Sequence, residues 1–235
     1  MTFVQIIDCK TSRFDDMDRL MDDWVETTKG KRTATHSLIG KDRSDGSHFI
    51  EIVEFPTYED AMRNSNLPET DRIFREMVAL CDEMPTFTDL DVVRDEQLLA
   101  ATARKVFETM SAPGELPPLN DLFAEDVHDH AFVGEQDTIG LDAVRRDIEM
   151  WRSAFDFTFT IEDQITEGDL VCSRGTWTGT HRGDFLGIAA TGRQATITGT
   201  IVFRCGPDGK IAESWWQYDR LGLMSQLGAL DTLGT

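Results

Sequence analysis

An acidic side chain follows an aromatic strand near the end of the chain, within residues 213–228. The run ESWWQYD predicts a strand, in which side chains two residues apart share a face. Trp215, Gln217 and Asp219 would therefore point the same way. Because an apolar pocket raises the pKa of an aspartate toward neutrality, Asp219 is a candidate for proton transfer. A second interpretation is that Asp219 caps a helix starting near Leu221, a position that aspartate favours.

Histidines are the next candidates for chemistry. His130 is either a partner for a substrate carbonyl or for Asp219, or an ordinary half-buried residue of a short strand. His128 would share its face, and Asp129 between them suggests a metal ion. Ligands packed this tightly match no standard spacing, so no metal site is predicted. His181 precedes a glycine-containing loop and is either a substrate contact or a solvated loop residue.

Three tryptophans are candidates for the wall of a ligand cavity. Trp151, Trp177 and Trp215 are predicted, with Gln217, to contact a substrate, although aromatic residues at such spacings also form ordinary core. Glu213 lies on the predicted face of Asp219 but about 20 Å away along an extended strand. That distance is too long for two carboxylates to share a proton.

The elements that must position these residues begin with an N-terminal α+β unit. Strands are predicted over residues 2–10, 32–41, 48–55 and 87–93. A helix follows Ser12, which is expected to cap it, and helical patterns also cover residues 57–64 and the run after Pro68. The order β-α-β-β-α-β predicts a ferredoxin-like split unit.

The second half begins with helices and continues as a long sheet. A boundary at residues 95–97 divides the chain into predicted domains 1–96 and 97–235. Amphipathic helices are predicted around residues 99–110 and 141–155, followed by strands over 161–165, 170–180, 194–204 and 211–218. Helices followed by antiparallel strands predict a second α+β domain.

Composition excludes several classes of function. The formal net charge is −20, which disfavours nucleic acid or an anionic membrane as a partner. The four scattered cysteines form no C-x-x-C pair, and the first residues show no signal-peptide pattern, so a reduced cytoplasmic protein is expected. Nucleotide-binding, flavin and serine-hydrolase motifs are not found, and no cofactor is expected.

The second half resembles a known family through an ordered series of short motifs. These are HDH at 128–130, EGD at 167–169, GTH at 179–181, FLG at 185–187, TGR at 191–193, DGKI at 208–211, and Trp215 with Asp219 before LG at 227–228. Together they resemble the SnoaL-like polyketide cyclases, over residues 98–230. Ala189-Ala190 departs from the prolines that the family often has before TGR. The resemblance implies the cone-shaped fold of nuclear transport factor 2, with Asp219 as acid and base in an aldol closure.

The first half resembles the antibiotic-biosynthesis-monooxygenase-like family, on its element order and on the run FPTYEDAM at 55–62 followed by PET at 68–70. That resemblance implies a dimeric α+β barrel. A dimerising role is favoured over oxygenase activity, because an open sheet with helices on one face leaves the other face to bury.

These observations predict a cyclase-like enzyme that acts on a small hydrophobic polyketide or polycyclic metabolite through Asp219 and His130, and that forms a homodimer. The alternatives are a metabolite-binding protein without activity, a hydrolase or isomerase of the same fold, and a bifunctional oxygenase–cyclase.

Overall fold

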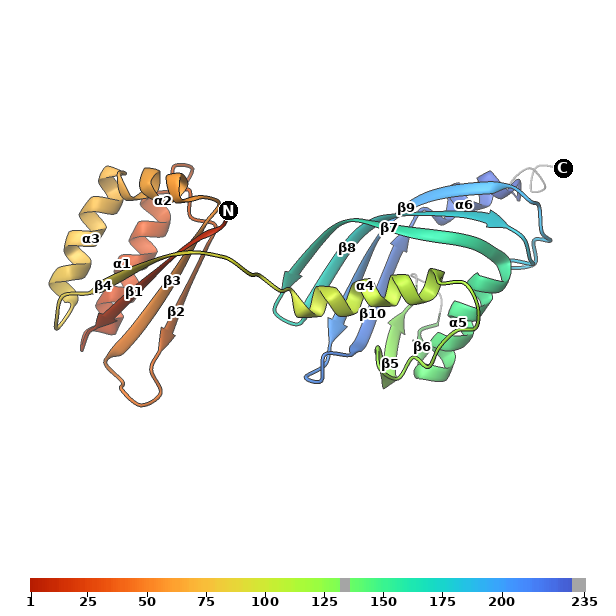
Figure 1. Cartoon of the computed structure of the whole chain (residues 1–235), viewed down its shortest axis with the longest axis horizontal. Helices are drawn as coiled ribbons and strands as arrows, with labels where there is room; N and C mark the ends of the chain where they lie inside the picture. Colours follow the sequence, from red (N-terminus) through yellow and green to blue (C-terminus); the bar gives the residue numbers. More distant parts are fainter. Residues whose placement is uncertain (132–135, 230–235) are drawn as a thin grey trace. The chain divides into compact units, whose positions relative to one another are not determined.

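The chain folds into two compact units, residues 1–95 and 96–235 (Figure 1). The computed structural model describes residues 1–131 and 136–229. Within this described part, no helix has both the length and the apolar character that crossing a membrane requires.

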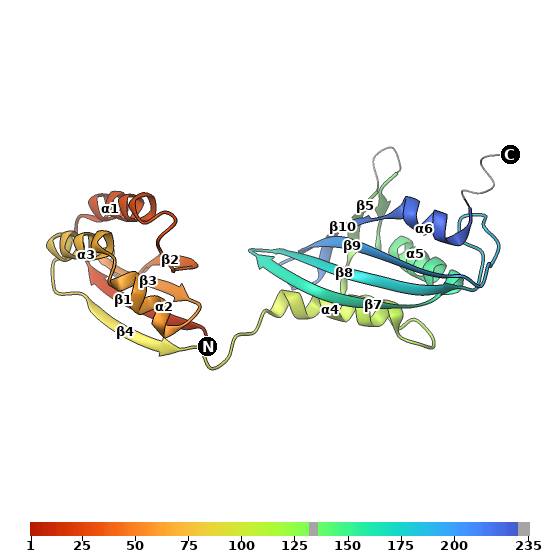
Figure 2. The same cartoon turned by 90° about the horizontal axis from the view of Figure 1, so that it is seen from above.

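The first unit is a four-stranded antiparallel sheet with its two long helices on one face (Figure 2). The strand order is β2-β3-β1-β4, which is ferredoxin-like, as the sequence predicts. The strands are β1 (Phe3–Lys10), β2 (His36–Lys41), β3 (His48–Phe55) and β4 (Thr86–Asp91). The helices are α1 (Phe14–Thr27), α2 (Tyr58–Ser65) and α3 (Pro68–Leu80).

The start of α1 differs from the prediction. The cap position is held by Arg13, and the Ser12 hydroxyl instead donates to Asp82 at 3.1 Å. The hydroxyl of Thr11 accepts the Arg13 N–H at 3.0 Å, so a neighbouring side chain satisfies a backbone donor at this end. The predicted serine cap is therefore wrong, because Ser12 finds a partner in a segment distant in sequence.

The two faces of this sheet have different surroundings. On the helix side, Phe3, Val53 and Phe55 are buried against α2. On the other side, the strand register aligns Leu38 with Ile52 and Ile52 with Ile6. Leu38 is 55% exposed, so apolar side chains lie on a face that no helix of this unit covers.

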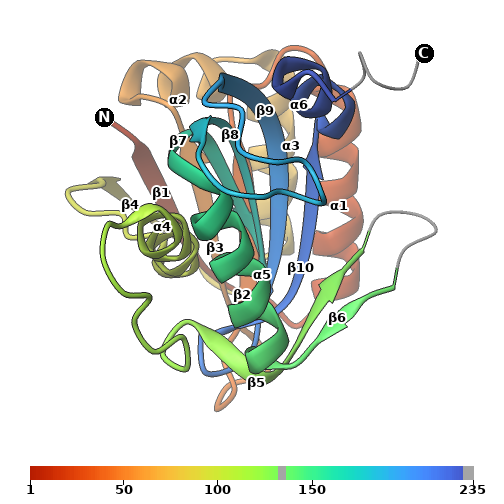
Figure 3. The same ribbon diagram turned by 90° about the vertical axis from the view of Figure 1, so that its right-hand side faces the viewer.

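The second unit is a curved six-stranded sheet of order β6-β5-β10-β9-β8-β7, with α4 (Leu98–Ser111) and α5 (Leu141–Ala154) on one side of it (Figure 3). Its strands are β5 (Phe123–His130), β6 (Thr138–Ile139), β7 (Phe155–Glu167), β8 (Leu170–His181), β9 (Gln194–Cys205) and β10 (Ile211–Tyr218). Short helix α6 (Arg220–Leu227) follows β10. Only β5 and β10 pair in parallel within the described residues.

The core of this unit lies between the helices and the concave face of the sheet. Phe107 of α4 stacks on Phe159 with ring centroids 4.3 Å apart and meets Trp216 edge-on at 5.9 Å. Val106 and Ala103 on the same helix are fully buried. This packing fixes α4 against the strands, and the space between the sheet and α5 forms the cavity described next.

Candidate active site

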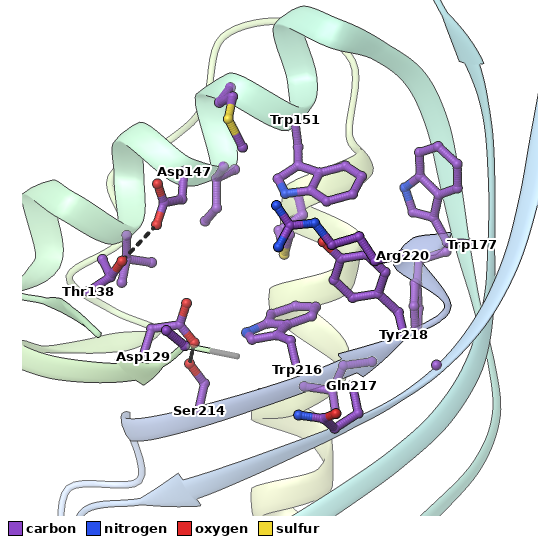
Figure 4. Close-up of a pocket in the computed structure, with 18 of the residues that line it drawn as sticks. Asp129, Thr138, Asp147, Trp151, Trp177, Ser214, Trp216, Gln217, Tyr218 and Arg220 are labelled. Carbon is purple, nitrogen blue, oxygen red and sulfur yellow. Dashed lines mark hydrogen bonds between the residues drawn. The ribbon is translucent and has the colours of Figure 1, made fainter. Parts of the chain in front are cut away.

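A cavity of about 390 Å³ lies on the concave side of the sheet (Figure 4). This volume is in the range of small-molecule sites. Most of its lining is apolar or aromatic, with a few polar groups at defined positions. It is lined by Phe107, Met110, Phe123, Asp129, His130, Ala131, Gln136, Thr138, Val144, Asp147, Ile148, Met150, Trp151, Phe157, Phe159, Trp177, Phe185, Leu186, Ile197, Thr198, Gly199, Ile201, Ser214, Trp216, Gln217, Tyr218 and Arg220.

Aromatic rings form one part of the wall. Trp151 of α5 meets Trp177 of β8 with centroids 5.8 Å apart, and it meets Tyr218 at 5.7 Å. Gly179 leaves room for this arrangement, because a Cβ there would lie 2.5 Å from the Trp177 ring. These edge-on rings form a rigid apolar surface that suits a flat hydrophobic ligand.

Asp129 lies on β5, which pairs in parallel with β10, and it points into the cavity (Figure 4). The register places Asp129 beside Ser214 of β10, and the Ser214 hydroxyl donates a hydrogen bond to it. Burial raises the pKa of Asp129 from an ordinary value of 3.8 to about 6, opposed by the Ser214 hydrogen bond and reinforced by Asp147. This carboxyl group can therefore exist in both protonation states near neutral pH.

A second carboxylate lies near Asp129. Asp147 of α5 accepts a hydrogen bond from the Thr138 hydroxyl at 3.2 Å, and both residues line the cavity (Figure 4). Figure 4 shows Arg220 and Tyr218 toward the tryptophans, away from the two aspartates. The cavity thus has an acidic end and an aromatic end.

The opposite face of β5 and β10 holds a different cluster. His130 stacks on Trp215 with centroids 4.5 Å apart and planes inclined by 3°, and its Nε2 lies 2.9 Å from Glu213. Glu213 also lies 3.0 Å from the Arg204 guanidinium. Although His130 borders the cavity, its ring is engaged by these residues on the outer side.

Asp219 does not lie where the sequence placed it. Its carboxylate accepts the Gly222 N–H at 2.7 Å and caps α6, and its side chain is exposed. Neither Asp219 nor Trp215 is among the described residues that line the cavity. Of the three residues predicted to form this wall, Gln217 lines the cavity and Trp215 does not, because the strand presents Ser214, Trp216 and Tyr218 to the concave side. A catalytic role for Asp219 stays a prediction.

The remaining predicted residues divide between the cavity and its surroundings. Trp151 and Trp177 line the cavity, and Gln217 borders it with an exposed side chain. His181 is fully buried behind the wall, stacked on Phe155 at 5.0 Å, with Nδ1 3.1 Å from the Thr191 hydroxyl. His181 is therefore neither a lining residue nor a solvated loop residue.

Asp129, Ser214, Thr138 and Asp147 are among the polar lining residues that sequence reasoning did not assign to the cavity. A usable signal was present in and just after β10, where Glu213 and Gln217, followed by Asp219, make one face strongly polar. The alternate set, Ser214, Trp216 and Tyr218, carries no charge and is the better candidate for a cavity wall. Because the side-chain period of a strand is two, choosing the other face of β10 replaces Trp215 by Trp216 as the expected wall residue.

Comparisons with known proteins agree with this architecture. The family model for SnoaL-like polyketide cyclases matches residues 101–227, more than half of the chain. The chain belongs to the SnoaL-like polyketide cyclase family. Comparison with curated proteins gives no match.

Two solved structures share the fold of the second unit of this family member. TsrD from Streptomyces laurentii is 27% identical, with a TM-score of 0.50, and the match covers 58% of this chain and 98% of that protein. A candidate SnoaL-like polyketide cyclase from Jannaschia sp. CCS1 is 20% identical, with a TM-score of 0.53, covering 60% and 98%. An antibiotic biosynthesis monooxygenase covers 40% of this chain at a TM-score of 0.35. The first unit is identified as ferredoxin-like from the strand order β2-β3-β1-β4 of its sheet.

Proposed function

We propose that the second unit binds a flat hydrophobic polyketide or polycyclic molecule and closes a ring by cofactor-free acid–base catalysis, with Asp129 as the proton-transfer group. The observation that carries this proposal is a carboxyl group with a pKa near neutrality in an aromatic-lined cavity. Membership of the cyclase family supports the reaction class.

An intramolecular aldol closure uses one carboxyl group twice. The ionised form of Asp129 removes a proton from the carbon beside a substrate carbonyl, and the enolate carbon attacks a second carbonyl of the same molecule. The resulting alkoxide takes the proton back from the Asp129 carboxylic acid, so the product is an isomer of the substrate. A pKa of about 6 keeps both forms of the group accessible at neutral pH.

The neighbours of Asp129 have supporting roles in this proposal. The Ser214 hydroxyl orients the carboxylate, and Asp147 opposes its ionisation through like charge. The hydrogen bond from Thr138 in turn holds Asp147. The tryptophans at the aromatic end then position the rings of the substrate, so that its reacting carbon lies at the acidic end.

Exchange of a substrate proton tests the role of Asp129 directly. The full chain is incubated in D₂O with an aromatic β-keto ester, and loss of the proton beside the carbonyl is followed by NMR. Asp129→Asn is expected to slow the enzyme-catalysed exchange by about two to four orders of magnitude. Asp219→Asn, which tests the competing prediction from sequence, is expected to leave exchange within about threefold of the original chain, because the side chain caps a helix outside the cavity.

A reversed result, in which only Asp219→Asn abolishes exchange, would transfer the proposed role to Asp219. Saturable binding of the ester without enhanced exchange would favour the alternative of a binding protein. Asparagine also caps helices, so Asp219→Asn should leave the free energy of unfolding nearly unchanged, whereas Asp219→Ala, which removes the cap, should lower it by about 1 kcal/mol in urea unfolding.

The first unit is proposed to hold two copies of the chain together. Its sheet presents Leu38, Ile50 and Ile52 on the face opposite the helices, and Leu38 is more than half exposed. Pairing this face with the same face of a second copy would remove the apolar side chains from water. The proposed homodimer needs no cofactor and no nucleic acid.

A further inference from the structure

Two histidines and an aspartate converge on the outer face of β5, away from the side chain of Asp129. The Nε2 atom of His128 lies 2.6 Å from Oδ2 of Asp137, and Nδ1 of His130 lies 3.6 Å from the same oxygen. One ligand atom from each of the three residues lies within 4.8 Å of the others. Asp137 precedes β6, so the cluster joins two strands that pair in the sheet.

The backbone orients these side chains before any ligand binds. His128 and His130 are two residues apart on β5 and therefore share a face, with ring centroids 4.0 Å apart. The backbone N–H of Ala131 donates to Oδ1 of Asp137 at 2.9 Å. Because Oδ1 is engaged, Oδ2 is the oxygen that faces both imidazoles.

Residues behind His130 fix the direction of its second nitrogen. Nε2 lies 2.9 Å from Glu213, whose other oxygen lies 3.0 Å from Arg204, and Trp215 covers the ring. A carboxylate acceptor at Nε2 makes that nitrogen the N–H donor and leaves the Nδ1 lone pair toward Asp137. A histidine that donates one N–H to a carboxylate while its other nitrogen faces a shared point is the usual arrangement of a metal ligand.

We infer that His128, His130 and Asp137 form a binding site for a divalent transition-metal ion of the Zn²⁺ class. Two imidazoles with one carboxylate favour Zn²⁺, Co²⁺ or Ni²⁺ over Mg²⁺ or Ca²⁺, which prefer oxygen ligands. Ligands about 2.0 to 2.1 Å from a tetrahedral zinc ion lie about 3.3 Å from one another. The 3.6 Å separation already fits, and the exposed Asp137 side chain has to move by less than an ångström to open the 2.6 Å contact.

The proposed ion lies outside the catalytic proposal and does not depend on it. It would clamp β5 to the start of β6, where Thr138 reaches the cavity and holds Asp147. Its effect is therefore expected on the stability of this part of the cavity wall, without contact between the ion and a substrate.

Metal titration of the untagged, chelator-treated full chain tests the inference. Zn²⁺ is expected to bind with one-to-one stoichiometry in calorimetry. Co²⁺ is expected to give the intense visible absorption of a four-coordinate ion, with three protein ligands and one water. His128→Gln and Asp137→Asn should each weaken Zn²⁺ binding at least tenfold, and Glu213→Gln should weaken it by about 10- to 100-fold through the orientation of His130.

His36→Gln is the matched control, because His36 is an exposed histidine 3.7 Å from a single carboxylate, Glu54, in the first unit. It should leave Zn²⁺ affinity unchanged. The inference is overturned if the original chain shows neither stoichiometric Zn²⁺ binding nor the Co²⁺ absorption, an outcome that needs no variant to fold. It is equally overturned if His128→Gln binds as tightly as His36→Gln while both give the circular dichroism of the original chain.

Discussion

The burial of Asp129 should be measurable as a pH-dependent difference in stability between the original chain and Asp129→Asn. The folded chain raises the pKa of this carboxyl from an ordinary 3.8 to about 6. The folded state therefore keeps the proton to higher pH than the unfolded state does. Stability from this group is fully present below about pH 4 and is lost as pH rises through about 6.

The size of the effect follows from the two pKa values. At neutral pH the ionised carboxylate disfavours the fold by about 3 kcal/mol, since each pKa unit corresponds to about 1.4 kcal/mol. About 1.4 kcal/mol of this penalty develops between pH 5 and 7.5, a range above the sequence pI of about 4.5. Asparagine has no such titration and can still accept the Ser214 hydrogen bond. The stability of Asp129→Asn relative to the original chain should rise by that amount across the range.

Urea unfolding followed by tryptophan fluorescence provides the assay. Four of the five tryptophans lie in the second unit, and a Trp24→Phe background removes the signal of the first. Groups that titrate alike in the original chain and in Asp129→Asn cancel when the two stabilities are subtracted. The charged neighbours Asp147, His130 and Asp137 are present in both proteins. Asp126→Asn, an exposed position on the same strand, is the control and should give a flat difference. If the stability of Asp129→Asn relative to the original chain changes by less than about 0.3 kcal/mol between pH 5 and 7.5, the argument that burial raises the pKa of Asp129 is refuted.

Three other predictions concern binding, assembly and thiol chemistry. Trp216→Phe should weaken binding of a polycyclic aromatic ketone several-fold in a fluorescence titration, because Trp216 lines the cavity. Trp215→Phe, on the outer face of β10, should leave binding unchanged. Equal losses would contradict the assignment of the two faces of β10. In light scattering, Ile52→Asp should convert a homodimer to a monomer, whereas Val25→Asp on α1 should leave the dimer intact. If the unmodified chain is itself a monomer, the proposed homodimer is wrong. Burial, and after it the hydrogen bond with Cys81, raises the pKa of Cys9 to about 12. Cys9 should therefore react with a thiol reagent far more slowly in the folded chain than in the urea-unfolded chain. Comparable rates in the two states would argue against its burial.

Much of the architecture was predictable because local patterns and long-range packing agree. The β-α-β-β-α-β order of the first unit follows from alternating strands and amphipathic helices, and the observed strand order is the one that this succession favours. The first helix shows the limit of such reasoning. Ser12 has the right chemistry for a cap, but Asp82, distant in sequence, takes its hydroxyl.

The elements of the candidate site were predictable, but the structure places the side chains of Trp215 and Asp219 outside the cavity lining. Sequence alone indicated that β10 and the histidine segment contribute to the site, because aromatic and titratable residues gather there in an order resembling the cyclase family. Sequence alone also showed that Asp219 has the chemistry of a helix cap, which is how the structure uses it.

The parallel pairing of β5 with β10 and the curvature of the sheet decided which side chains meet. They bring Asp129 beside Ser214 inside the cavity, and Glu213 beside His130 outside it, from positions more than eighty residues apart. Strand periodicity places alternate residues on opposite faces but does not say which face is concave. That choice depends on where α4 and α5 pack, and burial on that side then sets the pKa of Asp129.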